Sequence, residues 1–118
     1  NKSVFLTDDY NQLHQESIIF LKKELEQKSE KQVIVASHHV PTFFNYPPKY
    51  SDSKINTAFA SEQAALIENS KIDHWIFGHH HYNRPDFSIG KTMMHTNQLG
   101  YVKYGENQGY SDSKHIIV

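Results

Sequence analysis

Two clusters of histidine are the residues of this chain best suited to metal chemistry. Nine of the 118 residues are histidine, and five of these stand in the runs His38-His39 and His79-His80-His81. Neutral imidazole is a common ligand for divalent transition metals. In an extended backbone His79 and His81 would point to one side, about 6.6 Å apart, with His80 opposite. Two imidazoles so spaced can each hold one ion of a two-metal hydrolytic centre, whose ions lie about 3.5–4 Å apart.

Each histidine cluster follows a short apolar run. Val33–Ala36 precedes Ser37 and the first cluster, and Ile72–Phe77 precedes Gly78 and the second. Apolar, β-branched runs without alternation are typical of strands covered on both faces. A glycine such as Gly78 suits a close approach of the backbone to a site. The sequence therefore predicts two buried strands, each ending on histidines.

Helical segments precede both predicted strands. Asp9–Gln27 has an amphipathic pattern, and Thr57–Ser70 resumes helical character before the second strand. Strands joined through a helix lie parallel by the right-handed crossover rule, and sites in such sheets lie at the carboxyl ends of the strands. Both histidine clusters should therefore meet at one edge of the sheet. The apolar stripe of the first helix is formed by Leu13, Ile18, Leu21 and Leu25.

The remaining segments predict an irregular loop and further strands. Val40–Asn56 interleaves prolines with aromatic residues, which predicts a long irregular loop held down by aromatic packing. Asp86–Ile89 and Thr92–His95 flank a two-residue turn, which predicts a hairpin and a β meander. Ile116–Val118 has the composition of a further strand. The order of elements predicts an α/β fold in which buried strands alternate with helices.

Composition excludes several classes of function. Lys and Arg number 12 and Asp and Glu 13, so charge gives no sign of binding to nucleic acid or to an anionic membrane. The chain has no cysteine, which excludes thiolate metal sites and cysteine nucleophiles and assigns no compartment. No run reaches the roughly 20 apolar residues that a membrane-spanning helix needs.

Other histidines have simpler interpretations. A lone histidine is more often a surface or hydrogen-bonded residue than a ligand, so His14, His74 and His115 are assigned no role. His39 and His80 neighbour the predicted ligands. They are open to three interpretations: groups that orient a ligand, substrate contacts, or plain packing residues.

Three segments resemble the calcineurin-like metallophosphoesterases, a superfamily of Ser/Thr phosphatase-like enzymes. Val33–Pro41 resembles the family's strand-histidine-proline motif, with Val40 as an extra residue before the proline. Gly78–His81 is similar to its Gly-His-x-His motif, and Thr96–Tyr101 to a segment that often follows in bacterial members. The family's ligand is the first histidine after the strand, which implies His38 in preference to His39.

The resemblance implies a fold, a metal centre and a reaction. Residues 1–118 would form the C-terminal part of a single metallophosphoesterase domain, a partial αββα sandwich. His38 and His79 would bind one metal ion and His81 the other, from among Mn, Fe, Zn, Co and Ni in divalent or trivalent form. The reaction implied is direct hydrolysis of a phosphomonoester or a phosphodiester.

The family's N-terminal motifs have no counterpart in this sequence. These are Asp-x-His, Gly-Asp-x-x-Asp and Gly-Asn-His-Asp or Gly-Asn-His-Glu, which supply carboxylate and amide ligands. We therefore expect the partner of this chain to be the missing N-terminal half of the same domain, and the chain alone to be inactive and to self-associate through uncovered sheet. Two rival interpretations are a degenerate metal- or ligand-binding module and a structural α/β domain that chelates metal adventitiously.

Overall fold

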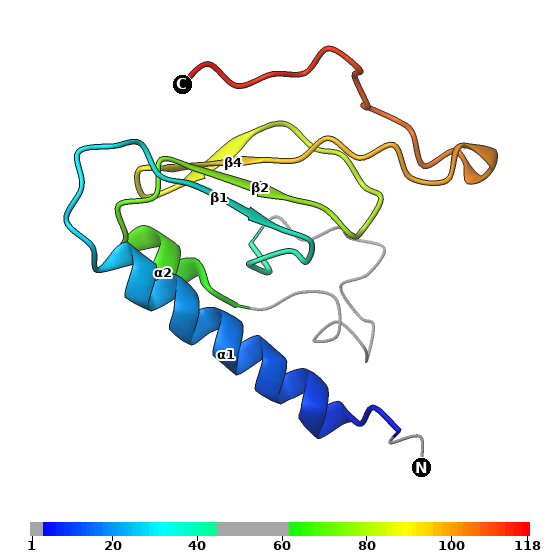
Figure 1. The fold of residues 1–118 in the computed structure, drawn as a ribbon. Helices are drawn as coiled ribbons and strands as arrows, with labels where there is room; N and C mark the ends of the chain where they lie inside the picture. Colours follow the sequence, from blue (N-terminus) through cyan, green and yellow to red (C-terminus); the bar gives the residue numbers. More distant parts are fainter. Residues whose placement is uncertain (1–3, 45–61) are drawn as a thin grey trace. The chain divides into compact units, whose positions relative to one another are not determined.

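The computed structural model describes residues 4–44 and 62–118, which fall in two compact units, Asn1–Lys31 and Gln32–Val118. The first unit contains helix α1, and the second contains helix α2 and a four-stranded mixed sheet (Figure 1). This confirms the α/β class. None of the helices in the described residues is both long and apolar enough to cross a membrane.

Helix α1 spans Thr7–Leu25, so the predicted helix over Asp9–Gln27 begins and ends two residues earlier than expected. Its first turn is closed by the Asp9 carboxylate, which accepts a hydrogen bond of 2.7 Å from the Leu6 N–H. Acidic side chains in the first turn and lysines in the last turn favour the helix dipole. Both ends of the helix are therefore stabilised by charged side chains.

The sheet has the strand order β1-β2-β4-β3. Strands β1 (Ile34–Ser37) and β2 (His74–Phe77) are parallel, as predicted, and β2 is also parallel to β4 (Thr92–His95). Strand β3 (Phe87–Ile89) pairs with β4 in the antiparallel sense and forms the edge. The predicted hairpin of β3 and β4 is confirmed. The predicted meander is wrong, because the chain crosses over before β3 and places β4 beside β2 in the parallel sense.

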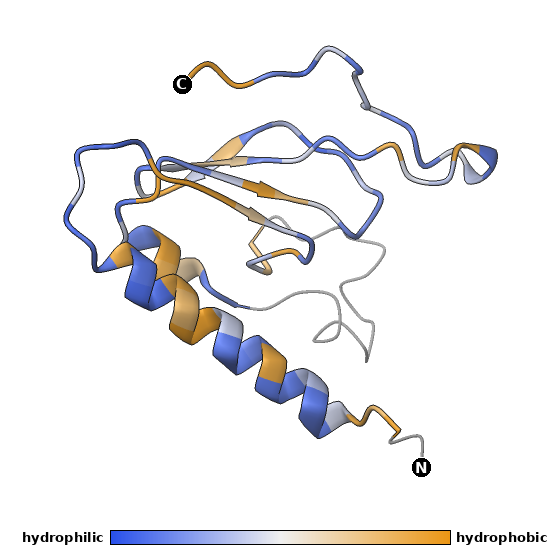
Figure 2. Ribbon diagram, in the orientation of Figure 1, coloured by the Kyte–Doolittle hydropathy of each residue, from blue (hydrophilic) through white to orange (hydrophobic). Residues whose placement is uncertain are grey.

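One face of the sheet carries the core. Trp75, Phe77 and Met94 lie on this face and are buried, because parallel neighbours place side chains in register on one side. Helix α2 (Ala64–Glu68) packs next to β3 and contributes Ile67, which is fully buried. Figure 2 shows the apolar composition of β1 and β2. The remaining buried apolar residues are Val40 and Ile72.

The opposite face of the sheet is open, and we call Ile34, Ala36, Ile76 and Met93 the open face. The register places these four residues on one side, with Ala36 beside Ile76. Ile34 is 47% exposed, and Ile76 and Met93 are each 38% exposed. The prediction that both strands are covered on both faces is therefore wrong. A strand that is covered on one face only can have the same continuous apolar sequence as a strand that is covered on both faces.

The predicted C-terminal strand is absent from the residues that the structure describes, and the predicted loop and helix between β1 and β2 are described only in part. Ile116–Val118 is not a strand, since no neighbouring strand in the described part of the chain pairs with it. The segment after β4 contains one 3₁₀ turn, Val102–Tyr104, which ends at Gly105 in the left-handed conformation. Most of the predicted loop Val40–Asn56 and the start of the predicted helix Thr57–Ser70 lie outside the described residues.

Candidate metal centre

The carboxyl ends of β1 and β2 bring the two histidine clusters together. Parallel pairing continues one step past the strands, because the Gly78 N–H donates a hydrogen bond of 3.2 Å to the carbonyl oxygen of His38. This contact places His38 and His39 beside His79. The sequence prediction that both clusters meet at one edge of the sheet is confirmed for these three residues.

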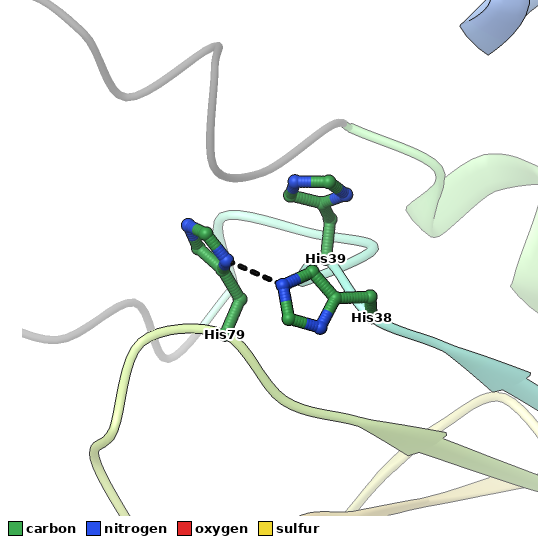
Figure 3. Close-up of side chains that lie close together, drawn as sticks. All are labelled: His38, His39 and His79. Atoms are coloured by element: carbon green, nitrogen blue, oxygen red, sulfur yellow. Dashed lines mark hydrogen bonds between the residues drawn. The ribbon is translucent and has the colours of Figure 1, made fainter. Parts of the chain in front are cut away.

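Three imidazoles face one another at this edge (Figure 3). His79 Nδ1 lies 2.7 Å from His38 Nε2, a hydrogen bond between the two rings. One nitrogen from each of His38, His39 and His79 lies within 4.8 Å of the others. The ring centroids are 4.7–5.0 Å apart. We call His38, His39 and His79 the histidine cluster.

The histidine cluster fits a single transition-metal ion. Nitrogen ligands lie about 2.0–2.1 Å from zinc, so two ligands on one ion are at most about 4.2 Å apart. The three nitrogens lie within 4.8 Å of one another, so the group could hold one ion once the 2.7 Å hydrogen bond between His38 and His79 opens and frees both nitrogens. Among the described residues no carboxylate joins the group. The donor set is therefore neutral and rich in nitrogen.

The protonation of His79 suits a ligand. Partial burial lowers the pKa of His79, and repulsion from His39, His38 and His81 lowers it further. A lowered pKa keeps the imidazole neutral, with a lone pair available, at physiological pH. Burial is the largest cause of this lowered pKa, and the neighbouring imidazoles add to it.

A serine connects the core to the histidine cluster. The Ser37 hydroxyl donates a hydrogen bond of 2.8 Å to the carbonyl oxygen of His39. The Ser37 hydroxyl oxygen in turn accepts a hydrogen bond of 2.9 Å from Trp75 Nε1, whose ring is buried on β2. Ser37 therefore fixes the backbone that carries His38 and His39 against the core.

The second histidine run is not extended, so the predicted geometry of His79 and His81 is wrong. Strand β2 ends at Phe77, and His79 and His81 have φ angles of 76° and 50°, in the left-handed region. Alternation of side chains requires extended backbone, and two left-handed residues remove it. The run therefore turns away from the sheet at the site.

His81 has a separate set of contacts. Its Nδ1 lies 2.8 Å from Glu106 Oε2, and its backbone N–H donates a hydrogen bond of 2.7 Å to Gln98 Oε1. The ring meets Tyr101 edge to face, with centroids 4.9 Å apart. Nothing in the sequence pattern pointed to Glu106, which lies 25 residues from His81 in a segment without periodicity. His81 is still near enough to His79 for repulsion between the two rings to lower the pKa of His79.

His80 lies within the fold. Its exposure is 6%, and its ring is edge-on to that of His79, with centroids 5.7 Å apart. Of the interpretations left open for His80, a plain packing residue agrees best with this burial. His39 is only partly buried and belongs to the histidine cluster.

A second histidine pair was missed. His95 Nδ1 lies 2.7 Å from Asp86 Oδ2, and His95 Nε2 lies 2.9 Å from His74 Nδ1. Lys114 Nζ donates a hydrogen bond of 2.7 Å to the other oxygen of Asp86. The predicted hairpin contains the signal: with Ile89 opposite Thr92, counting back places Asp86 opposite His95. His74, which sequence reasoning assigned no role, belongs to a hydrogen-bonded network.

Comparison of the chain with protein-family models, with curated proteins and with solved structures found no match. The functional assignment therefore depends on the residues and their geometry.

Proposed function

We propose that this chain supplies the histidine ligands of a dinuclear metal centre that hydrolyses a phosphate ester, either a monoester or a diester. His38 and His79 hold one ion in this proposal, and His81 holds the other. The observation that carries it is the 2.7 Å contact between the His38 and His79 nitrogens at the carboxyl ends of two parallel strands. Binding sites of α/β sheets lie at that edge.

The residues of this chain would hold the ions as neutral ligands. The lowered pKa of His79 favours its neutral form, and the contact with Glu106 leaves Nε2 of a neutral His81 as the nitrogen with a lone pair. His39 is within reach of the first ion. When bound, the ions would supply Lewis acidity toward a phosphoryl oxygen and a nucleophilic water at neutral pH.

Catalysis would require acidic ligands from outside this chain. Three imidazoles do not neutralise two dications, and no described carboxylate joins the histidine cluster. In the proposal the N-terminal half of the same domain supplies them, and this chain alone is inactive. The ions come from Mn, Fe, Zn, Co and Ni, the metals that imidazole and carboxylate ligands accept.

The neutral donor set favours one alternative, a non-catalytic metal- or ligand-binding module. A site built from imidazoles alone binds a transition metal without a bridging carboxylate to support a second ion. The two proposals differ in metal stoichiometry and in turnover. The alternative predicts one ion and no hydrolysis.

The test is metal stoichiometry together with hydrolysis of an aryl phosphate and an aryl phosphodiester. The 118-residue chain is compared with a version that includes any residues encoded before Asn1. We expect only the longer protein to bind two ions and turn over. His38→Ala or His79→Ala should then lower activity by roughly 100-fold or more, because each removes a ligand of the ion that polarises the substrate.

His115→Ala is the matched control, since His115 is exposed and its ring contacts the nearby carbonyl of Ser113. It should retain metal and activity. Hydrolysis that persists in the His38→Ala and His79→Ala variants would exclude the proposed centre. One bound ion without turnover in the longer protein would favour the binding module.

A further inference from the structure

The side chain of Glu106 contacts the ring of His81, a candidate metal ligand. This contact determines which ring nitrogen of His81 has a lone pair that can bind a metal ion. Glu106 Oε2 lies 2.8 Å from His81 Nδ1 and also accepts a hydrogen bond of 2.7 Å from the Tyr101 N–H. An ionised carboxylate only accepts hydrogen bonds, so Nδ1 of His81 must carry the proton. In the neutral ring the lone pair is then on Nε2.

The backbone of His81 is also fixed by hydrogen bonds. Its N–H donates to Gln98 Oε1, and the Gln98 amide nitrogen donates in turn to Thr96 Oγ1 at 2.7 Å and to the Tyr82 carbonyl at 3.2 Å. Gln98 is 8% exposed, so its amide is fixed within the fold. Backbone and ring of His81 are therefore oriented by two separate groups.

Gly100 allows the Glu106 contact to form. Its φ angle is +62°, and an added Cβ would lie 2.6 Å from Glu106 Cβ and 3.0 Å from His81 Cβ. Any side chain at this position would collide with both partners. The two side chains therefore pack directly against the backbone at Gly100, which fixes their separation.

We propose that Glu106 is the positioning residue of His81, which it holds as the Nδ1–H tautomer so that Nε2 is the nitrogen that binds an ion. The role as metal ligand rests on the proposed function, whereas the tautomer does not. Carboxylates that accept a hydrogen bond from a ligating histidine fix the ring and raise its basicity. Glu106 lies 25 residues from His81 and outside the motifs that resemble a known family.

The first test is the tautomer of His81 in the metal-free 118-residue protein, measured by long-range ¹H–¹⁵N NMR. We expect Nδ1–H in the wild type and in Glu106→Gln, whose amide oxygen can replace the acceptor shared by His81 and Tyr101. Glu106→Ala should shift the ring toward Nε2–H. An unchanged tautomer in a folded Glu106→Ala protein would overturn the proposal.

The second test is Zn²⁺ affinity of the longer protein, which includes any residues encoded before Asn1, measured by calorimetry with the metal alone. Glu106→Ala should weaken binding at the His81 site about 10–100-fold, and Glu106→Gln should weaken it less, because it keeps the geometry and loses the charge. In a His81→Ala background, Glu106→Ala should cause no further loss. An additive loss there would mean that Glu106 does not act through His81.

Asp86→Asn is the matched control, because Asp86 makes the same kind of contact with His95, which is not a proposed ligand. It should leave both the His81 tautomer and Zn²⁺ affinity unchanged. If the longer wild-type protein binds no Zn²⁺, the proposed function fails, and the tautomer result alone then decides the role of Glu106.

Discussion

At the scale of residues, Asp86 is the carboxylate whose protonation matters most for the fold. Burial raises the pKa of Asp86, but hydrogen bonds from Lys114 and His95 and their positive charges outweigh burial, so the pKa lies below its ordinary value of 3.8. The partner His95 is 6% exposed. Asp86 therefore stabilises a buried imidazole and an ammonium at once.

This shift gives a prediction for stability against pH. A group whose pKa is lower in the folded state contributes stability above its unfolded pKa, and the contribution is lost as pH falls through the folded pKa. Asp86→Asn should therefore flatten the acid side of the profile and cost about 1 kcal/mol at neutral pH, a value reduced because Asp86 is partly exposed. Urea unfolding from neutral pH down to about pH 2 measures both effects, because the contribution of Asp86 is lost as pH falls below its ordinary pKa of 3.8 and through the lower folded value.

Asp112→Asn, at an exposed aspartate, is the control and should keep the acid dependence of the wild type. If Asp86→Asn had the same pH profile as the wild type, the network of Asp86, His95 and Lys114 would contribute no linked stability.

At the scale of elements, Ser37 connects two strands to the histidine cluster. Removing its hydroxyl leaves the Trp75 indole N–H, which is buried, without its acceptor and releases the His39 carbonyl. Ser37→Ala should cost about 1–3 kcal/mol of stability, the range for an unsatisfied buried donor. It should also weaken metal binding, because the backbone that carries the cluster is less fixed.

Thermal unfolding and Zn²⁺ calorimetry measure the two effects of Ser37→Ala. Ser37→Thr keeps a hydroxyl and should restore much of both properties. Ser88→Ala, at an exposed serine of β3, should change neither. Full metal affinity in a destabilised Ser37→Ala protein would show that Ser37 supports the core and does not position the cluster.

The part of the site that depends on strand pairing could be predicted from the sequence. Two apolar runs separated by a helix fix a parallel pair, and a parallel pair places the residues that follow each strand side by side. This is why His38, His39 and His79 meet as expected. The network of Asp86 and His95 follows from the predicted hairpin by counting residues from its turn.

The part of the site that depends on backbone after the strands could not be predicted. Left-handed φ angles at His79 and His81 are uncommon for residues other than glycine, so extended backbone was the reasonable expectation. The glycine that allows close approach is Gly100 and not Gly78, where an added Cβ would meet His38 O at an ordinary 3.6 Å. Glu106 belongs to an irregular segment, for which periodicity gives no position.

At the scale of the whole molecule, the open face of the sheet predicts self-association. Ile34, Ile76 and Met93 are exposed on the same face of adjacent strands, with Ile34 and Met93 on either side of His74, an arrangement that a second chain or the missing half of a domain can cover. We expect the 118-residue chain to associate with rising concentration. Ile76→Thr combined with Met93→Thr should weaken association about 30-fold or more, since burial of each side chain contributes on the order of 1 kcal/mol.

Sedimentation velocity over a range of concentrations measures this association. Ile19→Thr is the control, because Ile19 is an exposed apolar residue of α1 and not of the sheet. It should leave association unchanged. A wild-type chain that stays monomeric at every concentration would mean that the open face tolerates water without a partner.

The left-handed backbone of His79 and His81 has a consequence for how these positions can vary. Each such residue costs roughly 1–2 kcal/mol relative to ordinary backbone, a cost that glycine would avoid. Glycine would also remove the imidazole. Selection for stability and selection for the imidazole rings therefore act in opposite directions at both positions. A histidine retained at either position indicates that the imidazole contributes more to function than the left-handed backbone costs in stability.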